Sequence, residues 1–251
     1  MSILIVPPIL AHRGARSFAP ENTLAAFAMA KQCGLHWVEL DVQLAACGEV
    51  IVFHDDTLDR TTNGTGPVHL HPYDYLKTLD AGSWFHPTFA EERIPTLQAV
   101  LQLLNQLDLA VNIEIKNMPG MEGPLVEKVV AVIQKSAFQP ANFISSFSVP
   151  ILERVRDVFP TAGLGFLMHT WQPDWSTVCD ALRAVAVDVN SDILNAARVQ
   201  EIKATGRALL SYTVNDPVVA KRLFSWGADA VFSDCPPLFL EAFGLQGPPV
   251  C

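Results

Sequence analysis

The sequence predicts an α/β fold, a closed (β/α)8 barrel of the TIM type, and three observations support this. From residue 109 onward, short β-rich runs alternate with helical patterns at intervals of roughly 20 to 35 residues, which is typical of βα units. Two further strands precede this run and six lie within it, which gives eight. The length of 251 residues, half of them hydrophobic, suits one such barrel. We therefore expect a single catalytic domain over residues 1–251.

The eight expected strands are rich in Val, Ile, Leu and Ala. They are residues 9–13, 37–44, 110–115, 142–146, 162–168, 184–189, 208–213 and 230–232. No G-x-G-x-x-G motif follows the first strand, which disfavours a dinucleotide-binding open sheet. Right-handed crossovers between parallel strands then favour closure into a barrel.

Helices are expected between these strands where start and stop signals frame an apolar period. The clearest are residues 22–33, 96–106, 121–135, 149–158, 195–204 and 217–226. Thr96 and Ser148 are suitable N-caps, and Asn22 could cap the first helix. Asp216 and Gly227 frame the last of these helices with a start and a stop signal.

The chain between Leu44 and Leu109 is too long for a simple βα connection. A run at residues 50–54 suggests a hairpin off the second strand. Residues 55–95 are rich in Gly, Pro, His, Thr and aromatic residues, so we expect a small inserted lobe that buries its aromatic side chains. An insertion after a barrel strand lies at the carboxyl-end mouth, where active sites form. The lobe is therefore a candidate lid.

Composition excludes several classes of protein. The formal net charge is −9, and no dense Lys/Arg cluster occurs, which argues against nucleic-acid binding. The five cysteines are scattered and odd in number, which favours a reducing compartment over a disulfide framework. The apolar start lacks a basic segment and a cleavage site, and no run is long enough for a membrane span. We expect a cytoplasmic protein; the sequence leaves open whether it forms a homodimer.

Acidic residues on core strands carry the chemical signal. Side chains alternate along a strand, so Glu39 and Asp41 share one face of the second strand, and Glu114 and Lys116 share one face of the third. Buried carboxylates need a cationic partner. A divalent ion held by hard oxygen ligands satisfies this need, and a salt-bridge network with Arg13 and Lys116 is the alternative.

Two histidines are expected at the same mouth. His12 ends the first strand and His54 ends the hairpin from the second. A metal flanked by two imidazoles, with Arg13 and Lys116 as further positive charge, suits cleavage of a phosphodiester. Phe147, Tyr212, Asn215 and Asp234 also lie at expected strand ends and are candidates for the pocket lining. The histidines at 69, 71, 86 and 169 have no partner pattern and are expected on the surface or in packing, and His36 precedes the second strand, at the wrong end of the barrel for catalysis.

Six motifs in order resemble the glycerophosphodiester phosphodiesterases, in particular the bacterial cytoplasmic members. The motifs are Ala-His-Arg-Gly at 11–14, Pro-Glu-Asn-Thr at 20–23, Glu-Leu-Asp-Val at 39–42, His-Asp-Asp-Thr-Leu-Asp-Arg-Thr-Thr at 54–62, Asn-Ile-Glu-Ile-Lys at 112–116 and Tyr-Thr-Val-Asn at 212–215. The run Asp-Ala-Gly-Ser-Trp-Phe at 80–85 adds to this resemblance. Tyr212 and Ser233 depart from it, since many relatives carry Trp and Thr there.

The resemblance implies hydrolysis of deacylated phospholipids, such as glycerophosphocholine or glycerophosphoethanolamine, to sn-glycerol 3-phosphate and an alcohol. By the same resemblance a divalent metal, Mg2+ or Ca2+, is bound by Glu39, Asp41 and Glu114, and His12 and His54 form the acid–base pair. The assignment of His54 as base and His12 as acid is open to exchange. The substrate-binding residues are then expected to be Arg13, Glu21, Asn22, Lys116, Phe147, Tyr212 and Asn215.

Two alternatives remain at this stage. A phospholipase D-like barrel that acts on lysolipids would need an exposed apolar entry for an acyl chain. A non-catalytic barrel that binds glycerophosphate compounds would have lost a metal ligand or a histidine, and this chain retains all of them.

Overall fold

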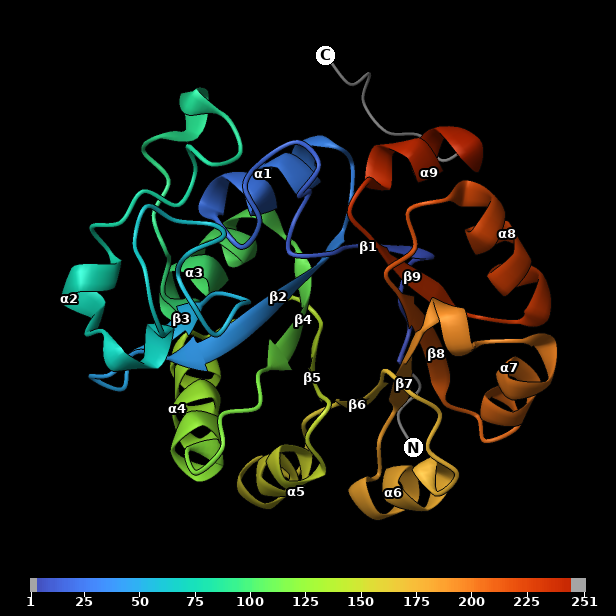
Figure 1. Ribbon diagram of the computed structural model, residues 1–251. Coiled ribbons are helices and arrows are strands. Elements are labelled where there is room, and N and C mark those ends of the chain that lie inside the picture. Colours follow the sequence, from blue (N-terminus) through green and yellow to red (C-terminus); the bar gives the residue numbers. More distant parts are fainter. Residues whose placement is uncertain (1–3, 245–251) are drawn as a thin grey trace.

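The computed structural model describes residues 4–244 and shows a closed barrel of eight parallel strands (Figure 1). The strand order is β1-β9-β8-β7-β6-β5-β4-β2, and β1 pairs with β2 to close the ring. A ninth strand, β3, extends β2 as an antiparallel hairpin. The strands are β1 Ile9–Ala11, β2 Trp37–Leu44, β3 Val50–Val52, β4 Ala110–Ile115, β5 Asn142–Ser146, β6 Leu164–Met168, β7 Ala186–Asn190, β8 Ala208–Tyr212 and β9 Ala230–Ser233. The predicted barrel is confirmed.

Helices surround the barrel and pack on its outer face (Figure 1). They are α1 Leu24–Gln32, α2 Tyr73–Leu76, α3 Leu97–Leu107, α4 Glu122–Lys135, α5 Val149–Val158, α6 Trp175–Leu182, α7 Ala196–Lys203, α8 Pro217–Trp226 and α9 Pro236–Ala242. Three 3-10 turns complete the elements, at Val68–Leu70, Pro87–Phe89 and Ser191–Ile193. No helix within residues 4–244 is both long and apolar enough to cross a membrane.

The start of the chain differs from the expected boundaries. The first strand ends at Ala11 rather than residue 13, because Arg13 takes a left-handed backbone with φ of 56°. The first helix begins after Asn22, whose φ of 58° is likewise left-handed. Thr23 is the N-cap instead, and its hydroxyl accepts the N–H of Ala26. This turn frees the Asn22 amide for the site described below.

The barrel interior at the amino ends of the strands is apolar and tightly filled. Small residues begin four of the eight strands there and leave space for two large rings, Trp37 and Phe143, whose centroids are 6.0 Å apart. The small residues are Ala110, Ala186, Ala208 and Ala230. Because inward positions recur every second residue, the next inward layers toward the carboxyl ends carry polar side chains such as Glu39 and Asn112. The packed layer therefore forms the floor of the polar site.

The inserted lobe of residues 55–95 lies beside β3 and has its own small core. Aliphatic side chains build it, chiefly Leu58, Val68, Leu76 and Leu79. The expected burial of its aromatic residues is wrong. Tyr75 and Trp84 are each 40% exposed, and Tyr73, Phe85 and Phe89 are half-buried. The role of the lobe as a lid stays a prediction.

Four of the five cysteines lie within the described residues. Cys33, Cys47, Cys179 and Cys235 are free thiols. Cys251 lies outside the described residues.

Candidate active site

A pocket of about 320 Å³ opens at the carboxyl ends of the barrel strands. Several of its residues directly follow a strand, and these include His12, Lys116 and Phe147. Charged groups line the side formed by β1, β2 and β4, whereas the opposite side is largely apolar and aromatic. The complete lining is His12, Arg13, Glu39, His54, Asn112, Glu114, Lys116, Phe147, Leu167, His169, Tyr212, Thr213 and Phe232.

Three carboxylates converge at the base of the charged side. Register pairs Asp41 with Glu114 across β2 and β4, and Glu39 stands two residues before Asp41 on the same inward face. One carboxylate oxygen from each lies within 4.8 Å of the others. Glu39 and Asp41 are almost fully buried, and Glu114 is half-buried. The alternating strand pattern thus produces the expected cluster.

The electrostatics of this cluster favour an added cation. Burial and two neighbouring carboxylates raise the pKa of Glu39 well above its usual value. Burial and Asp41 raise the pKa of Glu114 to about 7. Burial also opposes ionisation of Asp41, but Lys116 and Arg13 outweigh it and lower the pKa of that carboxyl. Three buried carboxylates of this kind match the oxygen donors that Mg2+ and Ca2+ prefer, so the residues present fit such an ion.

Two cations stand beside the carboxylates. The backbone N–H of Arg13 donates to Glu39 Oε2 at 2.9 Å, and the side-chain Nε of Arg13 lies 3.4 Å from Asp41 Oδ2. Lys116 Nζ lies 3.0 Å from Glu114 Oε1 and 3.5 Å from Asp41 Oδ1. Asn22 completes this shell, because its amide donates to Asp41 Oδ2 at 2.8 Å. Both cations line the pocket, where they can also reach an anionic ligand.

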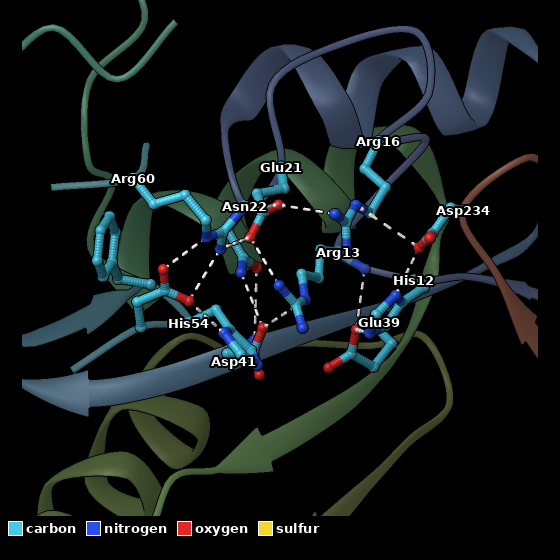
Figure 2. A network of polar contacts seen from close by, with 12 residues as sticks. His12, Arg13, Arg16, Glu21, Asn22, Glu39, Asp41, His54, Arg60 and Asp234 are labelled. Atoms are coloured by element: carbon cyan, nitrogen blue, oxygen red, sulfur yellow. Dashed lines mark hydrogen bonds and ion pairs between the residues drawn. The ribbon is translucent and has the colours of Figure 1, made fainter. Parts of the chain in front are cut away.

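His12 stands next to Glu39 on one side of the cluster (Figure 2). Its Nε2 is 4.0 Å from Glu39 Oε2, and its Nδ1 is 2.7 Å from Asp234 Oδ1. Burial lowers the pKa of His12, although the Asp234 carboxylate opposes this effect. Asp234 itself stays ionised: burial is outweighed by His12, Asn215 and Arg16, which bring its pKa to about 2.

His54 stands on the Asp41 side and has a similar partner (Figure 2). Its Nδ1 lies 2.6 Å from Asp55 Oδ1, and burial lowers the pKa of this imidazole as well. Arg60 holds Asp55 by two hydrogen bonds and donates two more to Glu21. The first residues of the inserted lobe are thereby connected to the loop that precedes α1.

The structure brings most of the predicted site residues into one pocket. His12, His54, Arg13 and Lys116 line it together with Glu39, Glu114, Phe147 and Tyr212, and Asp41 lies in the carboxylate cluster. Three predicted substrate-binding residues lie outside the lining and bind other side chains. Glu21 accepts from arginines, Asn22 donates to Asp41, and Asn215 donates to Asp234. Their substrate contacts stay predictions.

Other site residues escaped the sequence reasoning. His169 was expected on the surface or in packing, but it also lines the pocket, because it directly follows β6. Asn112, Leu167, Thr213 and Phe232 line the pocket as well. The sequence does indicate Asn112, because it stands two residues before Glu114 and so shares its face of the strand. In the structure it pairs in register with Glu39. Asp55 holds His54, because its Oδ1 lies 2.6 Å from Nδ1 of the imidazole.

Comparisons with known proteins agree with this geometry. The model of the glycerophosphoryl diester phosphodiesterase family matches residues 12–238. A putative glycerophosphodiester phosphodiesterase of Bacillus subtilis is 35% identical over 239 residues, which covers 93% of this chain and 96% of that protein. A glycerophosphodiester phosphodiesterase of Caldanaerobacter subterraneus is 37% identical over 235 residues, which covers 91% of this chain and 94% of that protein.

A solved structure gives the same result in three dimensions. It is a phosphodiesterase of Oleispira antarctica in complex with the product sn-glycerol-3-phosphate. Its TM-score is 0.93 at 34% sequence identity, and the match covers 95% of this chain and 97% of that one. This chain therefore belongs to the glycerophosphoryl diester phosphodiesterase family and is a phosphodiester hydrolase.

Proposed function

We propose that the protein hydrolyses water-soluble glycerophosphodiesters, such as glycerophosphocholine or glycerophosphoethanolamine, to sn-glycerol 3-phosphate and an alcohol. The observation that carries this proposal is one pocket in which a carboxylate cluster has one imidazole on each side, His12 and His54. Arg13 and Lys116 stand beside the same cluster. The related phosphodiesterase of Oleispira antarctica, which was solved with sn-glycerol-3-phosphate, supports the choice of product.

The carboxylates of Glu39, Asp41 and Glu114 would hold one divalent ion, Mg2+ or Ca2+. Such an ion supplies positive charge to the non-bridging oxygens of a phosphodiester. Arg13 and Lys116 add to that charge and orient the phosphate, since both side chains reach the pocket while anchored on Asp41. This preorganised charge acts where negative charge develops as the phosphorus is attacked.

The two histidines carry the proton transfers in this proposal. One imidazole, assigned as His54, removes the proton from the attacking glycerol hydroxyl, whose oxygen forms the new bond to phosphorus. The other, assigned as His12, gives a proton to the alkoxide that leaves as the old bond breaks. Water then opens the resulting cyclic phosphate by the same pair acting in reverse. Burial lowers both imidazole pKa values, so a neutral ring is available as the base.

The test is release of glycerol 3-phosphate from glycerophosphocholine and glycerophosphoethanolamine. The protein is first freed of metal, then assayed alone, with Mg2+, with Ca2+, and again after chelator is added. We expect product only in the metal arms and none after chelation. Turnover that persists in chelator would overturn the metal assignment, and binding without product in every arm would favour a non-catalytic barrel.

Lysophosphatidylcholine, assayed under identical conditions, separates the proposed substrate class from a lysolipid. We expect slower turnover of the lysolipid, because a pocket of about 320 Å³ leaves little room for a long acyl chain beside the phosphodiester. Faster turnover of the lysolipid would replace the proposed substrate class by the phospholipase D-like alternative.

A further inference from the structure

The seam that closes the barrel places a carboxylate behind His12. Strands β1 and β9 pair in register, with Ala11 opposite Ser233, and the His12 N–H donates to the Ser233 carbonyl at 2.9 Å. The residue that follows each strand is therefore His12 after β1 and Asp234 after β9. Their side chains meet, with Nδ1 of His12 2.7 Å from Oδ1 of Asp234 (Figure 2).

Asp234 is itself held by two further residues, Asn215 and Arg16. Asn215, which follows β8, donates from Nδ2 to Asp234 Oδ2 at 2.9 Å and accepts the Asp234 backbone N–H at 2.8 Å. Arg16 Nε lies 3.6 Å from Asp234 Oδ1. The side chain of Asp234 is 19% exposed, so this carboxylate has little freedom to rotate away. Groups from the loops after β1 and β8 thus fix the Asp234 carboxylate against the imidazole.

We propose that Asp234 is a positioning residue for the hydrolysis: it accepts the Nδ1–H of His12 and so keeps Nε2 directed at the phosphodiester. An ionised carboxylate can only accept, so Nδ1 must carry the hydrogen, and Nε2 is left for proton exchange. Nε2 lies on the pocket side, 4.0 Å from Glu39 Oε2. Asp234 lies outside the pocket lining of the described chain, so it acts through His12 rather than on substrate.

This inference rests on the proposed function, in which His12 transfers a proton. The competing explanation is that Asp234 only joins β9 to β1 at the closing seam. A joining role predicts lower stability with normal turnover per folded molecule. A positioning role predicts lost turnover that depends on the presence of His12, which a double-mutant cycle measures directly.

The experiment compares wild type, His12→Ala, Asp234→Asn and the double variant with glycerophosphocholine as substrate. Asn keeps the shape of Asp, but its amide group can favour the wrong tautomer of the imidazole. We expect kcat of Asp234→Asn to fall by about 10² to 10⁴ with little change in KM. In the His12→Ala background the same substitution should change kcat by less than about threefold.

Controls keep the outcomes distinct. Asp174→Asn removes an exposed carboxylate that makes no side-chain hydrogen bond at its helix end, and it should leave kcat and melting temperature unchanged. If Asp234→Asn does not fold, Asn215→Ala, which removes the side-chain contacts of Asn215 with Asp234 and with the Ser233 hydroxyl, should lower kcat about tenfold, again only when His12 is present.

Two results would overturn the inference: near-normal kcat in Asp234→Asn, or an equal loss of kcat with and without His12. The proposed function fails separately, through a wild-type protein that releases no glycerol 3-phosphate or a His12→Ala variant with normal kcat.

Discussion

Asn22 offers a substitution that tests the metal site without touching a ligand. Its side-chain Nδ2 donates to Asp41 Oδ2 at 2.8 Å, and its side-chain Oδ1 accepts the Asp41 backbone N–H at 3.4 Å. Asn22→Gly removes both contacts. Glycine also accepts the left-handed backbone at this position, where φ is 58°, so the change adds no strain.

The size of the effect follows from what remains around Asp41. Loss of a partner that orients a metal ligand typically weakens metal binding by about 10- to 100-fold, which is about 1.4 to 2.7 kcal/mol. Arg13 Nε stands 3.4 Å from the same oxygen and has no hydrogen-bond partner of its own among residues 4–244. It can take over part of the lost interaction. We therefore expect a shift nearer tenfold than 100-fold.

The assay is activity of metal-free protein titrated with Mg2+. Asn22→Gly should need about ten times more Mg2+ for half-maximal rate, with nearly normal kcat at saturation. Asn22→Ala deletes the same amide and should show the same shift. It should also lose about 1 kcal/mol of unfolding free energy, because alanine is strained at positive φ. An unchanged half-saturation in both variants would refute the role of Asn22 at the metal site.

Three further predictions concern catalysis, charge and packing. His12→Ala and His54→Ala should each lower kcat by roughly 10² or more while melting remains cooperative; near-normal turnover in either would exclude that histidine from catalysis. Glu21 is buried, which raises its pKa, but Arg60, Arg13 and Arg16 outweigh burial and bring the pKa to about 2. The contribution of Glu21 to the free energy of unfolding is therefore complete above the ordinary pKa of a glutamate and is lost as pH falls toward 2. Glu21→Gln should therefore cost about 3 to 5 kcal/mol at pH 6 and clearly less at pH 3, by urea unfolding; an equal cost at both pH values would contradict this. A Cβ on Gly82 would lie 1.9 Å from a backbone carbonyl oxygen of the lobe, so Gly82→Ala should lower stability by about 1 to 3 kcal/mol or more. Gly123→Ala, which meets nothing within 4 Å, is the control, and a matching urea midpoint for the two would contradict the clash.

The carboxylate cluster could be predicted because its information is local. Alternation along a strand places Glu39 and Asp41 on one face, whatever the rest of the chain does. Strands β2 and β4 are then neighbours, because the hairpin, the lobe and α3 between them add no further parallel strand to the barrel. Their register brings Asp41 opposite Glu114. The alternation of side chains along each strand and the order of the strands in the chain were sufficient to predict this part of the site.

Other contacts could not be predicted because they depend on closure or on loop conformation. His12 and Asp234 are 222 residues apart, and only the register at the closing seam brings them together. Glu21 and Asn22 follow a left-handed turn at Arg13 that no periodicity indicates. In the lobe, the aromatic residues were expected to form the core, but aliphatic residues such as Leu58 and Leu76 form it instead. Composition alone does not show which side chains fill a small core.

The two imidazoles come from distant parts of the chain, yet one series of charged groups joins their carboxylate partners (Figure 2). Arg16 stands 3.6 Å from Asp234 and 3.3 Å from Glu21, and Arg60 stands 2.7 Å from Glu21 and 2.6 Å from Asp55. Glu21 at the centre of this series is buried, whereas Arg60 is exposed, so solvent screens the contacts of Arg60 more than those of Arg13. A shift of the lobe that moved Arg60 would reach His54 through Asp55. The lobe is thus connected to the site by ionic contacts, independently of any closing movement.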